Sequence, residues 1–244
     1  MMRIIKVTNV EKFATKIIPK QPQKNKTIVE SILNNVRKNG DNAVRKYEKK
    51  FSGANISSLR VTQSEIKNAY SKVSKNELDA LRLVKARLQK TESAIKSLLK
   101  NTIISNDGIK ISKKFVPIES VGCYVPGGLA KYPSSVIMSV IPAKVAGVQR
   151  IVVVSPPNLD GDINPLTIVA ADICGTNEIY KTGGVQSIAA LSYGTKSISK
   201  VDKIVGPGGA FVTTAKSLIS NQTGIDMLAG PTELGIIADN STNP

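Results

Sequence analysis

The sequence of 244 residues contains no histidine. Without an imidazole, the chain cannot build a serine–histidine pair, a cysteine–histidine pair or a histidine metal site from its own residues. General acid–base chemistry of that kind would need a residue from another chain or from sequence beyond Pro244. The absence of histidine therefore argues against a complete hydrolase or zinc centre within these residues.

Cysteines and long apolar runs are also scarce. The two cysteines, Cys123 and Cys174, fit a reducing cytoplasm better than a disulfide scaffold. Residues 1–20 alternate basic and apolar side chains and show no secretory signal, and no apolar run approaches the length that crosses a bilayer. We expect a cytoplasmic protein with no membrane partner, whose 41% apolar residues can form a core.

Acidic residues are few in the first half of the chain. Residues 1–118 carry 26 Lys/Arg against 9 Asp/Glu, a balance of +17, whereas residues 119–244 carry 8 against 9, a balance of −1. Such a basic region could bind nucleic acid, but lysines also commonly solvate helix faces. It contains five aromatic residues and no RNA-binding motif, so we expect no nucleic-acid partner and keep a basic nucleic-acid-binding protein as an alternative.

The first half is predicted to be mostly helical. Helix starts are indicated by capping-box patterns at Thr27–Glu30, Thr62–Glu65 and Ser74–Glu77. The third opens the longest predicted helix, about Glu77 to Lys100, whose apolar stripe is expected to face the core: Leu81, Val84, Leu88, Ile95 and Leu99. Two β-prone runs joined through Asp107-Gly108 predict a hairpin.

From Ile118 onward, apolar strands alternate with helices. Strands are predicted at 118–125, 151–154, 178–182, 203–205 and 234–238, and Gly/Pro loops connect them to the helices. This alternation is typical of parallel βαβ units, so the predicted fold class is α/β with a parallel sheet. Ligands of such sheets bind at the carboxyl ends of the strands, where the glycine loops lie.

Several loop residues could contact a ligand. Gly206–Ala210 follows a strand and opens a helix, which suits either a phosphate cradle or a tight turn. Gln186 in the first turn of a helix could bind a ligand or face water, and Tyr124 could stack on a flat ring or pack on the sheet. Cys123 alternates with Tyr124; it could be a nucleophile, but with no visible base we favour a buried structural thiol.

Five ordered blocks together resemble the histidinol dehydrogenase family: GCYVPGG, SSVIMSVIPAKVAGV, TGGVQSIAALSYGT, VDKIVGPGGAFVTTAK and IDMLAGPTELGIIAD. The resemblance implies a zinc-dependent homodimer that oxidises L-histidinol to L-histidine with two NAD molecules, the last step of histidine biosynthesis. It implies a Rossmann-like NAD domain over 119–231, and a second domain in which the helical 1–118 joins 232–244.

The resemblance also assigns residues by position. Its NAD contacts fall on Tyr124, Pro126, Gln186, Gly208 and Gly209, and a substrate contact falls on Thr232. The family usually has asparagine at Gly209, and its metal-binding and catalytic segments lie past Pro244. We therefore expect the N-terminal portion of the enzyme, with no catalytic or metal residue of its own and no turnover alone. A short nucleotide-binding paralogue without catalysis is the other alternative.

Overall fold

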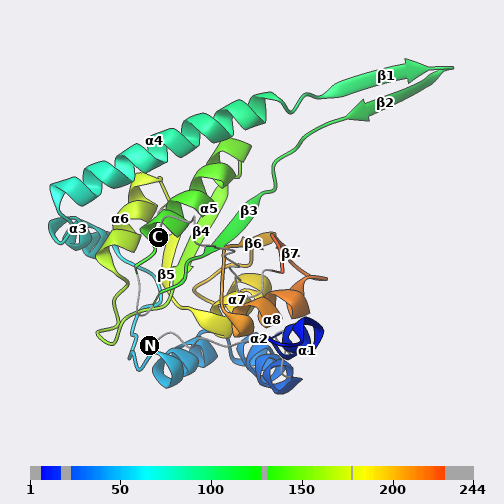
Figure 1. The fold of residues 1–244 in the computed structure, drawn as a ribbon. Helices are drawn as coiled ribbons and strands as arrows, with labels where there is room; N and C mark the ends of the chain where they lie inside the picture. The colour runs from blue at the N-terminus through cyan, green and yellow to red at the C-terminus, as the bar shows by residue number, and fades with distance from the viewer. Residues whose placement is uncertain (1–6, 18–22, 128–130, 177, 229–244) are drawn as a thin grey trace.

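A five-stranded parallel sheet lies at the centre of the molecule (Figure 1). The structure is a computed structural model that describes residues 7–17, 23–127, 131–176 and 178–228. The strand order is β5-β4-β3-β6-β7, and the strands are β3 (Ser120–Tyr124), β4 (Arg150–Ser155), β5 (Glu178–Lys181), β6 (Lys203–Val205) and β7 (Gly224–Ile225). The predicted α/β fold with a Rossmann-like parallel sheet is confirmed, whereas the short β7 was not predicted from the sequence. The predicted strand 234–238 lies outside the described residues.

Helices cover both faces of the sheet in two layers. One face carries α5 (Pro133–Ala146) and α6 (Pro165–Ile173), which α3 (Gln63–Ser71) and α4 (Lys75–Ser97) cover in turn. The other carries α7 (Gly184–Tyr193) and α8 (Ala210–Ile219), and α2 (Gln23–Phe51) packs on both of them. A further helix, α1 (Val10–Ile17), precedes α2.

The two hydrophobic clusters follow from the alternation of side chains along each strand. On β3, Cys123 belongs to the cluster beneath α5 and α6, and Tyr124 belongs to the cluster beneath α7 and α8. Residues from the N-terminal helices enter both clusters, for example Val36 of α2 in one and Leu81 of α4 in the other. The helical first half therefore packs directly on the layers of the sheet, and the predicted division at residue 118 stays a prediction.

The capping boxes decide where two of the N-terminal helices begin. Thr62 and Glu65 bond each other's backbone N–H groups at the start of α3, and Ser74 and Glu77 do so at α4, as predicted. The predicted cap at Thr27 is wrong, because α2 begins at Gln23 and Thr27 lies inside it. Gly40 is a non-helical residue within α2, with φ 52° and ψ −134°.

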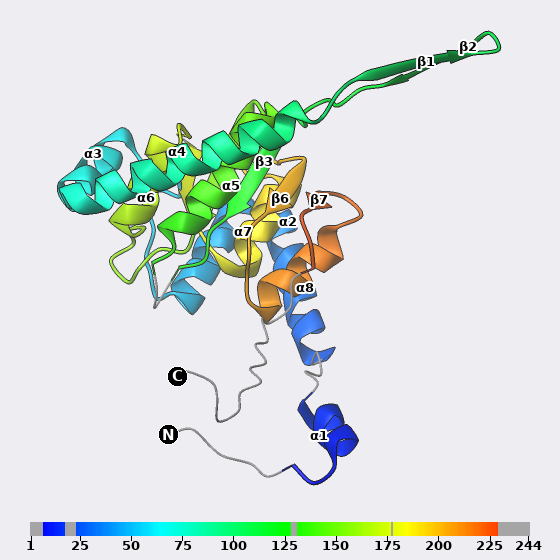
Figure 2. The same ribbon diagram turned by 45° about the horizontal axis from the view of Figure 1, so that its top comes forward.

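The apolar stripe of α4 packs on the core for only part of its length. Leu81 is buried and Leu88 is partly buried, but Val84, Ile95 and Leu99 are 42%, 52% and 52% exposed. The expectation of a core stripe is thus wrong for Val84, Ile95 and Leu99. The end of α4 runs past α5 toward a projecting hairpin (Figure 2). The hairpin is β1 (Thr102–Asn106) with β2 (Ile109–Lys113), antiparallel through Asp107-Gly108 as predicted.

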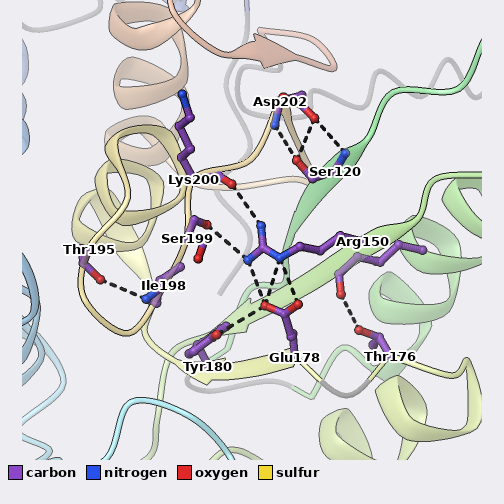
Figure 3. A network of polar contacts seen from close by, with 11 residues as sticks. Ser120, Arg150, Thr176, Glu178, Tyr180, Thr195, Ile198, Ser199, Lys200 and Asp202 are labelled. Atoms are coloured by element: carbon purple, nitrogen blue, oxygen red, sulfur yellow. Dashed lines mark hydrogen bonds and ion pairs between the residues drawn. The ribbon is translucent and has the colours of Figure 1, made fainter.

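The amino edge of the sheet is filled by contacts within the protein (Figure 3). Arg150 at the start of β4 donates to both carboxylate oxygens of Glu178 at the start of β5, at 2.9–3.2 Å, and to the carbonyls of Ser199 and Lys200. Asp202 accepts from the backbone N–H and hydroxyl of Ser120, which lowers the pKa of Asp202. These bonds tie the starts of β3, β4 and β5 to the segment that precedes β6.

Candidate functional site

A large cavity opens at the carboxyl edge of the sheet. It measures about 1340 Å³ and is lined by the segments that follow β3, β4 and β5, together with one face of α2 and the start of α8. Phe51 of α2 and Phe211 of α8 line this cavity and are 55% and 44% exposed. Exposed aromatic rings on a cavity wall can stack on a flat heterocycle. The sequence did not single out either ring for a site, because nothing local shows that α2 reaches the sheet edge.

Gln186 lies in the first turn of α7 and lines the cavity. The residue is only 2% exposed, and its Nε2 donates to Oε1 of Glu48 at 2.8 Å. Its own Oε1 is buried and has no hydrogen-bond partner among the described residues. Since a buried acceptor without a donor destabilises a fold, this oxygen is a candidate for a ligand contact.

Tyr124 at the end of β3 is buried, and it joins two of the glycine loops. Its hydroxyl accepts a long hydrogen bond of 3.4 Å from the Gly184 N–H. Its carbonyl oxygen lies against Gly206, where a Cβ would come within 2.0 Å of it. Burial raises the pKa of the phenol, so the hydroxyl stays protonated. Tyr124 thus fixes the position of both loops relative to β3. Pro126 lies two residues after the end of that strand.

The Gly206–Gly209 loop connects β6 to α8. Gly208 packs on α8 so closely that a Cβ would lie 2.4 Å from Cγ1 of Val212, whereas a Cβ on Gly209 would meet nothing within 4 Å. The first backbone N–H groups of α8 have no partner within the helix, and with the helix dipole they favour an anion. The start of α8 thus has the backbone chemistry that suits an anion, and there is open space beside Gly209.

A buried ion pair holds this loop from behind. Lys216 of α8 pairs with Asp226 and donates to the Gly206 carbonyl at 3.0 Å, while Asp226 accepts from the Gly206 N–H at 2.8 Å. Burial alone would raise the pKa of Asp226, but the bonds from Lys216 and from backbone N–H groups lower it. Asp226 is therefore ionised at neutral pH and ties the loop to α8. No sequence pattern predicted this pair.

The two cysteine thiols are not placed for catalysis. Cys123 is fully buried, and burial raises its pKa to about 12; the pKa of Cys174 is raised to about 11 for the same reason. A thiol at such a pKa is a poor nucleophile at neutral pH. The structural role predicted for Cys123 is confirmed.

The remaining sequence predictions concern metal and substrate contacts. Thr232 lies outside the described residues. Within the described part of the chain, no group of three or more His, Cys, Asp or Glu residues could hold a metal ion, and these residues do not fit a zinc site. None of the helices within the described ranges is long and apolar enough to cross a membrane.

Comparisons with known proteins agree on one family. A family model described as histidinol dehydrogenase matches residues 18–244. The histidinol dehydrogenase of Methanocaldococcus jannaschii is 47% identical over 217 residues, 89% of this chain and 50% of that protein. That of Clostridium acetobutylicum is 44% identical over 238 residues, 96% of this chain and 55% of that protein.

A solved structure has the same fold. The crystal structure of histidinol dehydrogenase from Elizabethkingia anophelis matches with a TM-score of 0.83 at 34% identity, covering 92% of this chain and 52% of that chain. The chain thus spans about half the length of the curated relatives it matches.

Proposed function

Since the chain belongs to the histidinol dehydrogenase family, we propose that it supplies the NAD-binding part of an enzyme that oxidises L-histidinol to L-histidine in two steps. NAD accepts the hydride in this chemistry. The single observation that supports the assignment is the cavity at the carboxyl edge, with the unpartnered acceptor of Gln186 on its wall.

The residues around the cavity have separate roles in this proposal. The ring of Phe51 or Phe211 stacks on a flat ring of the dinucleotide, and the backbone of Gly208 and Gly209 at the start of α8 binds the pyrophosphate. Gln186 accepts a hydrogen bond from the cofactor. Tyr124 and Pro126 are not among the residues that line the cavity; Tyr124 holds the Gly184 and Gly206 loops in place.

The zinc chemistry of the family is not assigned to these residues. The sequence has no histidine, and the described acidic and cysteine residues do not gather into a ligand set. We propose that residues 119–231 bind most of the cofactor and that Phe51 of α2 adds to this site from the first half of the chain. Residues 1–118 and 232–244 form a second domain in this proposal, with a substrate contact at Thr232.

We further propose that the protein works as a homodimer in the cytoplasm. The exposed isoleucines of the projecting hairpin support an interface with a second copy, since each is 57–65% exposed: Ile103, Ile104, Ile109 and Ile111. The two free cysteines support a reducing compartment.

Calorimetric titration of the 244-residue chain with NAD tests the cofactor assignment. We expect saturable binding that Gln186→Leu weakens about tenfold, since one hydrogen bond to a buried group is lost. Leu83→Gln on the exposed face of α4 is the matched control and should leave the affinity unchanged. Absence of NAD binding by a folded wild-type chain would overturn the proposal. Oxidation of histidinol by this chain alone would overturn the expectation that it lacks catalytic residues.

A further inference from the structure

Glu48 is a buried carboxylate that reaches the candidate site from the other half of the sequence. It lies on α2, 138 positions before Gln186, and is 1% exposed. Its Oε1 accepts three hydrogen bonds, from Oγ1 of Thr182 at 2.7 Å, from the Gly183 N–H at 2.8 Å and from Nε2 of Gln186 at 2.8 Å. Its Oε2 accepts from the hydroxyl of Ser52 at 3.1 Å.

Hydrogen bonds compensate this carboxylate without a cation. Among the ion pairs of the described residues, none includes Glu48. A buried carboxylate is costly unless its oxygens are bonded, and here the donors converge at the N-terminal end of α7, where the helix dipole favours negative charge. Oε1 is the acceptor for all three of these donors, so Glu48 acts as an acceptor toward Gln186.

This contact fixes which way the Gln186 amide points. In the reverse orientation, the amide oxygen would lie 2.8 Å from Oε1 of Glu48, and two acceptors would repel each other. The hydrogen bond to Glu48 therefore requires Nε2 of Gln186 on that side, and Oε1 is the amide atom left without a partner in the described part of the chain. That oxygen is buried and unpartnered, and Gln186 lines the cavity.

We propose that Glu48 is a positioning residue, which orients the Gln186 amide so that its oxygen receives a hydrogen bond from a hydroxyl or amino group of the bound dinucleotide. The inference rests on the proposed NAD site and adds to it a preference for ligands that donate a hydrogen bond at this point. A ligand that offers only an acceptor at this point leaves two acceptors facing each other and binds worse.

A double-mutant cycle separates positioning from general support of the fold. We expect Glu48→Ala to weaken NAD binding about tenfold in the wild-type background and less than twofold in the Gln186→Ala background, because its effect passes through Gln186. Glu48→Gln keeps an acceptor oxygen and should bind NAD within about threefold of wild type. Thr182→Val removes another bond to the same oxygen without touching Gln186 and should have less than a twofold effect. An equal loss from Glu48→Ala in both backgrounds would overturn the inference.

The side-chain amide of Gln186 gives a second readout that needs no NAD. In ¹⁵N-labelled protein, its NH₂ signals, identified by their absence in Gln186→Leu, should be shifted and protected from exchange in wild type and in Thr182→Val. They should lose that protection in Glu48→Asp, because the shorter side chain keeps the carboxylate but moves it away from Gln186. This variant also replaces Glu48→Ala in the test if Glu48→Ala does not fold. An unchanged signal in Glu48→Asp would refute positioning, whether or not NAD binds.

A wild-type chain that shows the protected amide but no NAD binding would reject the proposed function alone. The donor is identified with nicotinamide hypoxanthine dinucleotide, which lacks the adenine amino group. If the wild-type chain binds this hypoxanthine dinucleotide more weakly than NAD, and Gln186→Ala binds the two equally, the donor is the adenine amino group. If the wild-type chain binds the two dinucleotides equally, the donor is a hydroxyl group. Where the amine is the donor, Glu48→Ala should also remove the preference for NAD, and a preference that persists in Glu48→Ala would overturn the inference.

Discussion

Replacing Gly206 by alanine should destabilise the protein, whereas the same change at Gly209 should not. Gly206 has φ +114°, a region that L side chains rarely adopt, and its Cβ would lie 2.0 Å from the Tyr124 carbonyl oxygen. Ordinary contact begins at 3.4 Å, so the loop must move by the difference between 3.4 and 2.0 Å, about 1.4 Å. The atoms that the Cβ would meet belong to the backbone of Tyr124, so they cannot turn away as the end of a flexible side chain could.

The magnitude follows from two costs and one gain. Unfavourable backbone dihedrals cost about 1–3 kcal/mol, and forced overlap in a packed region costs about 1–3 kcal/mol. The reduced freedom of the unfolded chain returns about 0.4–1 kcal/mol. We therefore expect Gly206→Ala to lower the free energy of unfolding by about 1–6 kcal/mol.

Gly209 provides the matched control within the same loop. Its φ is −67°, and a Cβ there meets nothing within 4 Å, so Gly209→Ala should change the stability by less than about 1 kcal/mol. Urea unfolding followed by circular dichroism measures both variants against wild type. Equal stability of the two alanine variants would refute the argument, because it would mean that the loop is free to move away from Tyr124.

Three further predictions concern the cofactor, pH and the thiols. Gly209→Asn should tighten NAD binding about fivefold in calorimetry, since one side-chain hydrogen bond contributes about 1 kcal/mol; unchanged affinity would contradict a cofactor at Gly209. The pKa of Asp226 is lowered from its ordinary value of 3.8 in the folded state. Its ionised form therefore stabilises the fold at pH values above 3.8, and this stabilisation is lost as the pH falls through the folded-state pKa. Between pH 6 and pH 2, the free energy of unfolding of wild type should thus fall by more than that of Asp226→Asn in urea titrations, and parallel pH curves would count against the pair. Iodoacetamide should label neither Cys123 nor Cys174 in the folded protein at pH 7.5 and both in urea, as read by mass spectrometry; rapid labelling of the folded chain would contradict their burial.

Local chemistry was sufficient to predict most elements of the fold. The capping boxes at Thr62 and Ser74 act within four residues, and the turn at Asp107-Gly108 needs only its own backbone. The strand–loop–helix rhythm from Ile118 likewise implies parallel strands, because short connections through a helix allow little else. The error at Thr27 has the same origin: its capping pattern is local, but α2 packs on α7 and α8 and extends past it.

The sequence by itself determined the family, the α/β class and the glycine loops, since each is encoded in contiguous residues. Only the tertiary structure decided which residues meet at the carboxyl edge. Glu48 and Gln186 are 138 positions apart, and neither their spacing nor their type predicts the hydrogen bond between them. The same holds for the burial of α4, whose apolar stripe is uniform in sequence but faces α5 and α6 at one end and solvent at the other. The spacing of apolar residues along a helix determines which side of it is apolar. What packs against that side depends on where the rest of the chain lies.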